Sequence, residues 1–291
     1  MSRPHFDWAV AKKIVSLDRR TLIMGVLNTT PDSFYDHGRY NASSAAIAQA
    51  HKLAREGADI IDIGGESTRP DSDGVPAEAE LARVIPVIEA VASSFAGPIS
   101  IDTTKAEVAK AALAAGASII NDISGLSRDP GMIPLAAESG CGVVLMHMRG
   151  RPKNMQSLTD YDDPVADVKA ELAERLAGVL AGGVRPQAIV LDPGLGFAKT
   201  AEQNLEIMRR LDEFLDLKRP LLLGPSRKSF VGRALAAQGL ADQPDERLFG
   251  GVAAVALAAF KGASIVRVHD VAVARQALAV ADAVREGSFV C

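Results

Sequence analysis

Short hydrophobic runs rich in β-branched residues alternate with longer amphipathic stretches along the whole chain. The short runs predict strands at residues 22–28, 58–64, 98–102, 118–121, 142–146, 188–192, 221–224 and 264–268. Between most of them, apolar residues recur every three or four positions, which is typical of helices. The helices predicted in this way span residues 42–56, 77–91, 105–115, 164–181, 201–211, 247–260 and 271–284. The glycines expected to end helices in a left-handed conformation are Gly57, Gly116, Gly182 and Gly262.

The alternation of strand and helix predicts a parallel sheet covered by helices, because parallel strands need long crossover connections. The units recur about every 34 residues, and eight of them in 291 residues favour a single-domain α/β fold, the closed (β/α)8 or TIM barrel. An open doubly wound sheet is the alternative. We expect residues 21–288 to form the barrel and residues 1–20 to cap its bottom.

Composition excludes several classes of protein. The chain has 32 basic and 36 acidic residues and a net charge of -4, which argues against a nucleic-acid binder with a basic stripe. The longest uncharged apolar run, residues 250–260, is too short to span a membrane and predicts a buried helix instead. Two cysteines, Cys141 and Cys291, and the lack of a signal-peptide pattern suit a cytoplasmic protein. An anionic ligand would therefore need a local basic cluster.

Polar residues of many types follow nearly every predicted strand, where barrels of this class place their chemistry. Loops are polar in general, but acids, amides and bases directly after so many apolar runs favour a ligand site. Asp102, Asn121 and Asp192 offer mainly acceptors, which suit a flat heterocycle with adjacent N–H groups, such as a guanine or a pterin. We expect Lys228 to donate to the same ring. Met146 would pack on the ring face, although burial in the barrel core explains it equally well.

A second group of residues suits phosphate. Thr68, Arg69, Arg267 and His269 supply hydroxyl, guanidinium and imidazole donors, and phosphate sites in barrels often use the loops after the last two strands. Asn28 offers an amide oxygen to Mg²⁺, whose other ligands would be diphosphate and water. The histidines lack zinc-site spacing, and no dinucleotide fingerprint, Walker loop or Gly-x-Ser-x-Gly motif is complete.

Two longer motifs resemble the signatures of dihydropteroate synthases. They are Met24-Gly25-Val26-Leu27-Asn28-Thr29-Thr30-Pro31-Asp32-Ser33-Phe34 and Asp62-Ile63-Gly64-Gly65-Glu66-Ser67-Thr68-Arg69-Pro70. Shorter segments similar to the family's follow in the family's order, at residues 100–103, 120–123, 145–148, 192–194, 226–229 and 267–271. The resemblance covers roughly residues 20–285.

The resemblance implies a transferase of folate biosynthesis. Its reaction joins 6-hydroxymethyl-7,8-dihydropterin diphosphate to 4-aminobenzoate and gives 7,8-dihydropteroate and diphosphate. It further implies Mg²⁺ held at Asn28, a homodimer, and sulfonamides as competing ligands. Membranes and nucleic acids are not among the partners that it implies.

The resemblance also implies which residues act. For the pterin diphosphate they are Thr68, Asp102, Asn121, Met146, Asp192, Lys228, Arg267 and His269. For 4-aminobenzoate they are Phe34, Arg69, Pro70, Phe197 and Ser226. The catalytic residues that it implies are Arg69, Lys228, Arg267 and His269. Leu195, Ala198 and Pro225 depart from the family's pattern, which bears on substrate affinity and sulfonamide sensitivity.

Three alternatives remain open at this point. A methyltetrahydrofolate methyltransferase of similar barrel would share the pterin carboxylates, but it gives no reason for the Ser67–Pro70 loop or for Arg267 and His269. A pterin-binding relative without turnover is opposed by the intact Asn28 and Lys228. A sugar-phosphate barrel fits the acceptor-rich strand ends less well than a flat N–H-rich ring does.

Overall fold

The computed structural model describes residues 4–30, 38–68, 72, 74–240 and 243–289. Within this part of the chain, eight parallel strands form one sheet in the order β8-β7-β6-β5-β4-β3-β10-β9. Their bounds are β3 (Leu22–Asn28), β4 (Ile60–Gly64), β5 (Ile99–Asp102), β6 (Ile119–Asp122), β7 (Gly142–Met146), β8 (Ile189–Asp192), β9 (Leu222–Leu223) and β10 (Ile265–Val268). A parallel bridge between Leu191 and Leu221 joins β8 to the start of β9 and closes the sheet. The predicted barrel is therefore confirmed.

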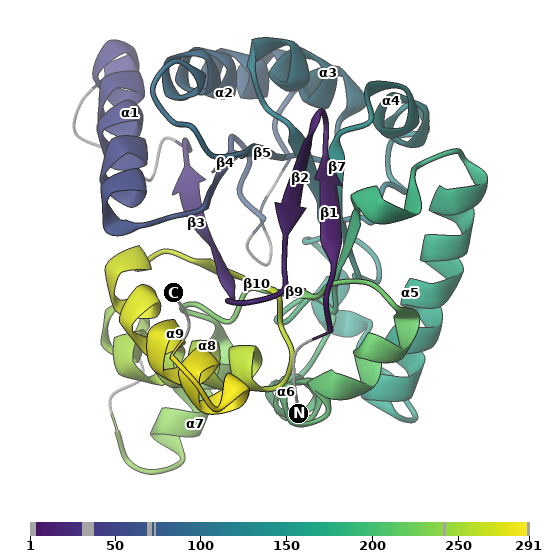
Figure 1. Ribbon diagram of the computed structural model, residues 1–291. Helices are drawn as coiled ribbons and strands as arrows, with labels where there is room; N and C mark the ends of the chain where they lie inside the picture. The colour runs from purple at the N-terminus through teal and green to yellow at the C-terminus, as the bar shows by residue number, and fades with distance from the viewer. Residues whose placement is uncertain (1–3, 31–37, 69–71, 73, 241–242, 290–291) are drawn as a thin grey trace.

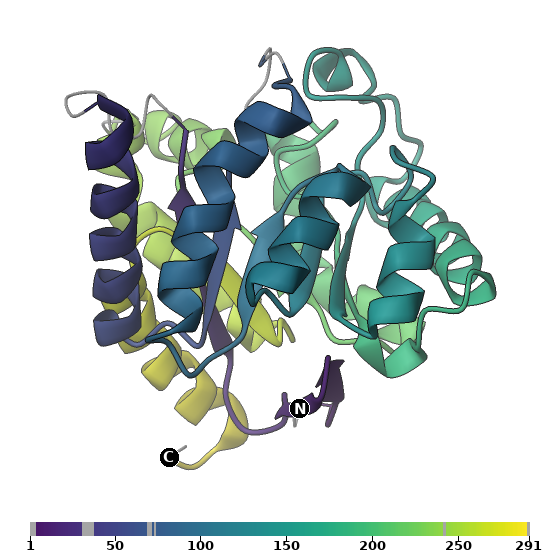
Figure 2. The same cartoon turned by 90° about the horizontal axis from the view of Figure 1, so that it is seen from above.

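Helices surround the sheet on its outer side (Figures 1 and 2). Their bounds are α1 (Gly38–Glu56), α2 (Ala77–Ala92), α3 (Ala106–Ala115), α4 (Met132–Ser139), α5 (Pro164–Ala181), α6 (Ala201–Arg209), α7 (Ser229–Ala236), α8 (Leu248–Phe260) and α9 (Val271–Glu286). Short 3₁₀ helices are η2 (Met155–Ser157), η3 (Pro186–Ala188), η4 (Leu211–Leu217) and η5 (Pro244–Arg247). No helix among the described residues is long and apolar enough to cross a membrane.

Two details of the helices differ from the sequence predictions. Gly182 has a φ of -76°, because its N–H still bonds to Gly178 O in the helical pattern, and Gly183 takes the left-handed conformation instead. Helix α8 is not fully buried, since Phe249 and Leu257 on one of its faces are 79% and 59% exposed. The apolar residues of α8 therefore lie on two faces, one packed against the barrel and one exposed to solvent.

A hairpin that the sequence pattern did not predict precedes the barrel. It pairs β1 (Asp7–Val10) with β2 (Lys13–Ser16), and in Figure 1 it crosses the centre of the ring of strands. Trp8 is fully buried there, and its Nε1 donates to Ala188 O at 2.8 Å, just before β8. Trp8 packs in one cluster with inward side chains of the strands, among them Met24 and Ile60. The hairpin therefore packs on the inner apolar layer of the barrel, while the cap of residues 1–20 and the domain boundary stay predictions.

Candidate active site

The alternation of side chains along each strand positions the site. Residues two apart point to the same face, so on several strands an inward apolar residue is followed two positions later by an inward polar one. The apolar layer over Trp8 contains Met24, Ile60, Ile119, Val144, Val190, Leu222 and Ile265. Two positions further along five of those strands stand Asp62, Asn121, Met146, Asp192 and Arg267. The interior is therefore apolar towards the N-terminal ends of the strands and polar towards their C-terminal ends.

Arg267 connects strands from opposite parts of the sequence. Its Nε donates to Asp62 Oδ2 at 2.6 Å, and its Nη2 donates to Asp102 Oδ2 at 2.7 Å. Asn121 Nδ2 donates to the same Asp62 oxygen at 3.1 Å, and Asn121 is the register partner of Asp102. The site thus holds a guanidinium between two carboxylates, which stabilises a charge cluster that is otherwise costly to bury.

Burial raises the pKa values of the two carboxylates that were predicted to bind the heterocycle. Burial raises the pKa of Asp192 to about 6, opposed by the hydrogen bond from Gly194 N to its Oδ1 at 2.7 Å and by the nearby Lys228. Burial also raises the pKa of Asp102, and Arg267 opposes that shift. Buried carboxylates with such pKa values suit a ligand whose N–H groups restore the missing hydrogen bonds.

A cation lies over an aromatic ring on the other side of the site. Lys228 Nζ is 4.2 Å from the centroid of the Phe197 ring, a cation–π distance. Burial, together with the positive charge of Arg267, lowers the pKa of Lys228 to about 8, and the negative charge of Asp192 opposes that shift. Phe197 belongs to a small apolar cluster with Met146, which is 5% exposed.

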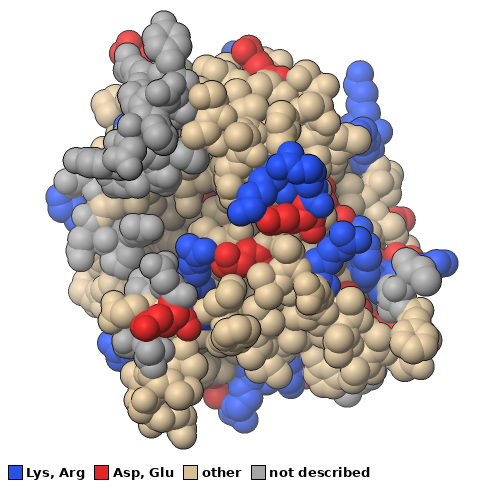
Figure 3. Space-filling view, turned by 90° about the vertical axis from the view of Figure 1, so that its left-hand side faces the viewer, with Lys and Arg blue, Asp and Glu red and all other residues tan. Residues whose placement is uncertain are grey.

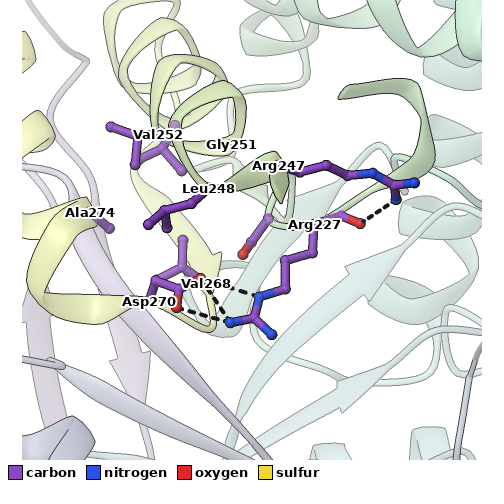
Figure 4. Close-up of a pocket in the computed structure, with 10 residues that line it drawn as sticks. Arg227, Arg247, Leu248, Gly251, Val252, Val268, Asp270 and Ala274 are labelled. Atoms are coloured by element: carbon purple, nitrogen blue, oxygen red, sulfur yellow. Dashed lines mark hydrogen bonds and ion pairs between the residues drawn. The ribbon is translucent and has the colours of Figure 1, made fainter. Parts of the chain in front are cut away.

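The loops after β9 and β10 face one another. Ser226 Oγ and His269 Nδ1 are 3.2 Å apart, and burial lowers the pKa of His269 to about 4. Beside them, Arg227 forms an ion pair with Asp270 at 3.0 Å, and Arg247 Nη1 donates to Arg227 O at 3.3 Å (Figure 4). Figure 4 shows these side chains next to a narrow hollow of about 20 Å³ that α8 closes on one side.

A second cavity, of about 280 Å³, lies beside the loop that carries Thr68. Lys105 Nζ donates to Glu66 and, at 2.5 Å, to the fully buried Glu80 Oε2. Glu66 also accepts from Val75 N at 3.3 Å, so one carboxylate joins the two ends of this loop. Thr68 itself is half-buried.

The structure brings most of the predicted site residues to the same end of the barrel. Asn28 ends β3 on the same face as Met24, and its register partner is Gly64. Phe34, Arg69 and Pro70 lie outside the described residues, so their contacts are not part of this geometry. The roles assigned to all of these residues stay predictions.

Among the charged residues of this region that were not predicted to act are Asp62 and Lys199. Asp62 is completely buried, and its Oδ2 accepts hydrogen bonds from both Arg267 and Asn121. Its place in the Asp62–Pro70 motif, two positions after Ile60, was an available signal. Lys199 is also buried beneath the loop after β8, and its position at the end of a Gly-rich motif gave no sign of its contacts.

On the face in Figure 3, which includes α1, basic and acidic side chains lie next to one another. Such a mixed surface agrees with the small net charge of -4. This face therefore adds no field of a single sign to that of the cations at the strand ends.

Comparisons with known proteins agree with this geometry. The family model described as "Pterin binding enzyme" matches residues 24–269. A dihydropteroate synthase of Synechocystis sp. is 48% identical over 280 residues, which cover 96% of this chain and 92% of that protein. The dihydropteroate synthase of Escherichia coli K12 is 46% identical over 261 residues, which cover 90% of each chain.

Solved structures give the same result. The dihydropteroate synthase of Xanthomonas albilineans with 4-aminobenzoic acid has a TM-score of 0.88 and 43% identity, over 98% of this chain and 99% of that one. The same enzyme in complex with 7,8-dihydropteroate has a TM-score of 0.85 and 42% identity, over 97% and 99% of the two chains. By its sequence, its barrel and the residues at its strand ends, the chain belongs to the dihydropteroate synthase family of pterin binding enzymes.

Proposed function

We propose that this chain condenses 6-hydroxymethyl-7,8-dihydropterin diphosphate with 4-aminobenzoate, releasing diphosphate and forming 7,8-dihydropteroate. The observation that carries the proposal is the polar inner layer of the barrel, in which buried carboxylates and an amide face cations at the C-terminal ends of the strands. The reaction makes the chain a transferase of folate biosynthesis.

The pterin half of the site would use the acceptors on β5, β6 and β8. Asp102, Asn121 and Asp192 are each buried, so their oxygens depend on protein or ligand donors for hydrogen bonds. The amino and ring N–H groups of a dihydropterin would bond to them, and Lys228 would donate to a ring acceptor. Met146 supplies an apolar contact for the ring face.

The diphosphate half would use hydrogen-bond donors from several loops. Arg267 Nε and Nη2 donate to the carboxylates of Asp62 and Asp102. Nη1 makes no hydrogen bond within the described residues, and it would donate to a phosphate oxygen. Thr68, His269 and Arg69 would add donors from the loops after β4 and β10. This gives Arg267 a place between the two halves, in contact with the pterin carboxylates and with the leaving group.

The 4-aminobenzoate would lie against Phe197 and Ser226. Phe197 presents its ring beside Lys228, whose charge would favour a carboxylate-bearing ring nearby. Phe34, Arg69 and Pro70 would complete this pocket. A sulfonamide would compete for it, and the dihydropteroate synthase of Yersinia pestis, whose solved structure is described as a sulfonamide drug complex, has a TM-score of 0.89 and 40% identity to this chain.

A magnesium ion fits the donor set at the end of β3. Among the described residues no group of three His, Cys, Asp or Glu side chains could hold a metal, so a metal held by protein ligands alone is not supported there. Asn28 offers a single neutral oxygen on the inner face of the barrel, which suits an ion that takes its other ligands from diphosphate and water. When bound, Mg²⁺ would neutralise charge that develops on the diphosphate.

The residues of this chain would lower the barrier by electrostatics. Loss of diphosphate leaves positive charge on the methylene and the electron-rich dihydropterin ring, which Asp102 and Asp192 stabilise. Arg267, His269 and Arg69 stabilise the negative charge on the departing diphosphate. The aromatic amine then attacks the carbon and loses a proton, and no covalent bond to the protein is needed.

The test is the release of diphosphate and the formation of 7,8-dihydropteroate by the purified protein. Both should require the pterin diphosphate, 4-aminobenzoate and Mg²⁺, and a sulfonamide should inhibit in competition with 4-aminobenzoate. A protein that binds the pterin but yields no amine-dependent product would contradict the proposal. The Lys228→Met variant, which lacks the proposed donor to the pterin ring, is the negative control. It should fold but lose activity.

We also propose that the chain forms a homodimer through α8 and α9. Phe249, Leu257 and Phe260 share one exposed face of α8, and Val280 and Val284 share one exposed face of the neighbouring α9. Apolar faces of this kind mark protein contacts more often than free surface. A cytoplasmic location stays a prediction from composition.

A further inference from the structure

A buried lysine that the proposed chemistry does not use ties together the loop after β8. Lys199 is 3% exposed, and its Nζ makes three contacts. It donates to Gly194 O at 3.1 Å and to Phe197 O at 2.9 Å, and it lies 3.0 Å from His147 Nδ1. The ammonium therefore has one acceptor for each of its three N–H groups.

The protonation of the neighbours supports this arrangement. His147 Nε2 is 2.9 Å from Glu171 Oε2, and this contact together with the hydrogen bonds from Arg149 lowers the pKa of Glu171 to about 2. Burial lowers the pKa of His147 to about 4, so the ring is neutral near pH 7. The ionised Glu171 can only accept, which places the ring proton on Nε2 and leaves Nδ1 to accept from Lys199. Burial lowers the pKa of Lys199 to about 7, and the negative charges of Asp192 and Glu171 oppose that shift.

The loop that Lys199 holds has an unusual backbone. Gly194, Gly196 and Ala198 have φ values of 70°, 80° and 50°, so three alternate residues lie in the left-handed region. For Ala198 this conformation is unfavourable and must be maintained by other contacts. The two carbonyls that Lys199 binds lie within this segment and fix its path.

The same segment links the pterin acceptor Asp192 to Phe197, the residue proposed to contact 4-aminobenzoate. Gly194 N donates to Asp192 Oδ1, and Gly194 O accepts from Lys199, so both polar groups of Gly194 are used in the anchor. Phe197 O accepts from Lys199 while the Phe197 ring lies under Lys228 Nζ. Phe197 N also donates to Gly194 O at 3.2 Å, the same carbonyl that accepts from Lys199, so removal of the ammonium would loosen both backbone contacts of Phe197.

We propose that Lys199 is a positioning residue for the 4-aminobenzoate pocket, holding Phe197 in place through its carbonyl. The inference rests on the proposed function, since it assigns a substrate to the Phe197 side of the site. Lys199 itself does not reach the substrate, and it acts through the loop backbone.

The experiment compares Lys199→Met with Lys199→Gln and with Lys261→Met. Met has a similar length and no donors, whereas Gln keeps two N–H groups but no charge. Lys261 is a surface residue whose Nζ lies 3.1 Å from Asp212, and it serves as the control. Steady-state rates are measured against each substrate in turn, with thermal melting of each variant as a check on folding.

We expect Lys199→Met to raise KM for 4-aminobenzoate at least about tenfold, the size of effect typical of lost hydrogen bonds to a charged group. KM for the pterin diphosphate should change by less than about threefold, which is clearly smaller than the expected rise in KM for 4-aminobenzoate. Lys199→Gln should lie between Met and wild type, and Lys261→Met should match wild type. A purely structural role would lower the active fraction, and therefore the maximal rate, with both KM values unchanged.

Equal rises in both KM values, or unchanged KM values in a folded Lys199 variant, would overturn the inference. If Lys199→Met does not fold, the split between the two KM values in Lys199→Gln decides the matter in the same way. A wild-type protein without amine-dependent product would instead defeat the proposed function, so the two failures are distinguishable.

Discussion

At the scale of single residues, the types of side chain at the site could be predicted but their partners could not. Apolar runs that end in Asp102, Asn121 and Asp192 identify strand ends, because side chains alternate with a period of two. The bonds from Arg267 to Asp62 and Asp102 join residues 205 and 165 positions apart, a separation that no local pattern encodes. The same holds for Lys199 and His147, which are 52 positions apart.

The pKa values of Asp192 and Lys228 predict a bell-shaped pH dependence of kcat/KM for the pterin diphosphate. Below about pH 6 Asp192 is protonated and loses acceptor capacity, and above about pH 8 Lys228 is neutral, so kcat/KM should fall on both sides. Rates from pH 5 to pH 10 measure this. Lys228→Arg, which stays charged, should lack the alkaline limb, and a flat wild-type profile would contradict the assignment.

Arg267→Met should destabilise the protein by about 3–5 kcal/mol, because it leaves two buried carboxylates without their cation. Arg227→Met removes an exposed ion pair with Asp270 and should cost at most about 1 kcal/mol. Urea unfolding near pH 7 compares the two. Similar losses in both variants would mean that the inner cluster is not held by Arg267.

At the scale of elements, long periodic segments were predicted well and short ones were missed. The bounds of β3, β7 and α5 agree with the sequence pattern because each is a long or strongly apolar run. The β1–β2 hairpin was not predicted, since residues 1–20 mix charges with scattered apolar residues. Helix α7 has eight residues, too few for a periodic signal.

Trp8→Ala should test the role of the hairpin. The change removes the side chain that fills the bottom of the barrel and should cost about 3–5 kcal/mol of unfolding free energy. Ile14→Ala on the same hairpin, where the side chain is 65% exposed, should change it by less than about 0.5 kcal/mol. The midpoint of chemical denaturation gives both values. The folded Trp8 variant should keep its KM values, because the site lies at the other end of the barrel.

At the scale of the whole molecule, the exposed apolar faces of α8 and α9 are a feature that the packing of the barrel does not explain. If they join two copies, Leu257→Glu should shift the protein from dimer to monomer, since a buried unpaired charge opposes association. Leu205→Glu on α6, also exposed, should leave the dimer intact. Light scattering after gel filtration measures the mass. A wild-type monomer at micromolar concentration would contradict the dimer.

The closure of the barrel has a further consequence. Strand β9 has two residues and is tied to the β8 side by a single bridge between Leu191 and Leu221, so the ring has a weak seam. Asp192 and Phe197 stand on one side of this seam, and Ser226 and Lys228 stand on the other. A bound ligand would span it as a temporary cross-link, and the amides of β9 should then exchange with solvent hydrogen more slowly than in the free protein. Substrate binding would thus stabilise the closure of the barrel between β8 and β9.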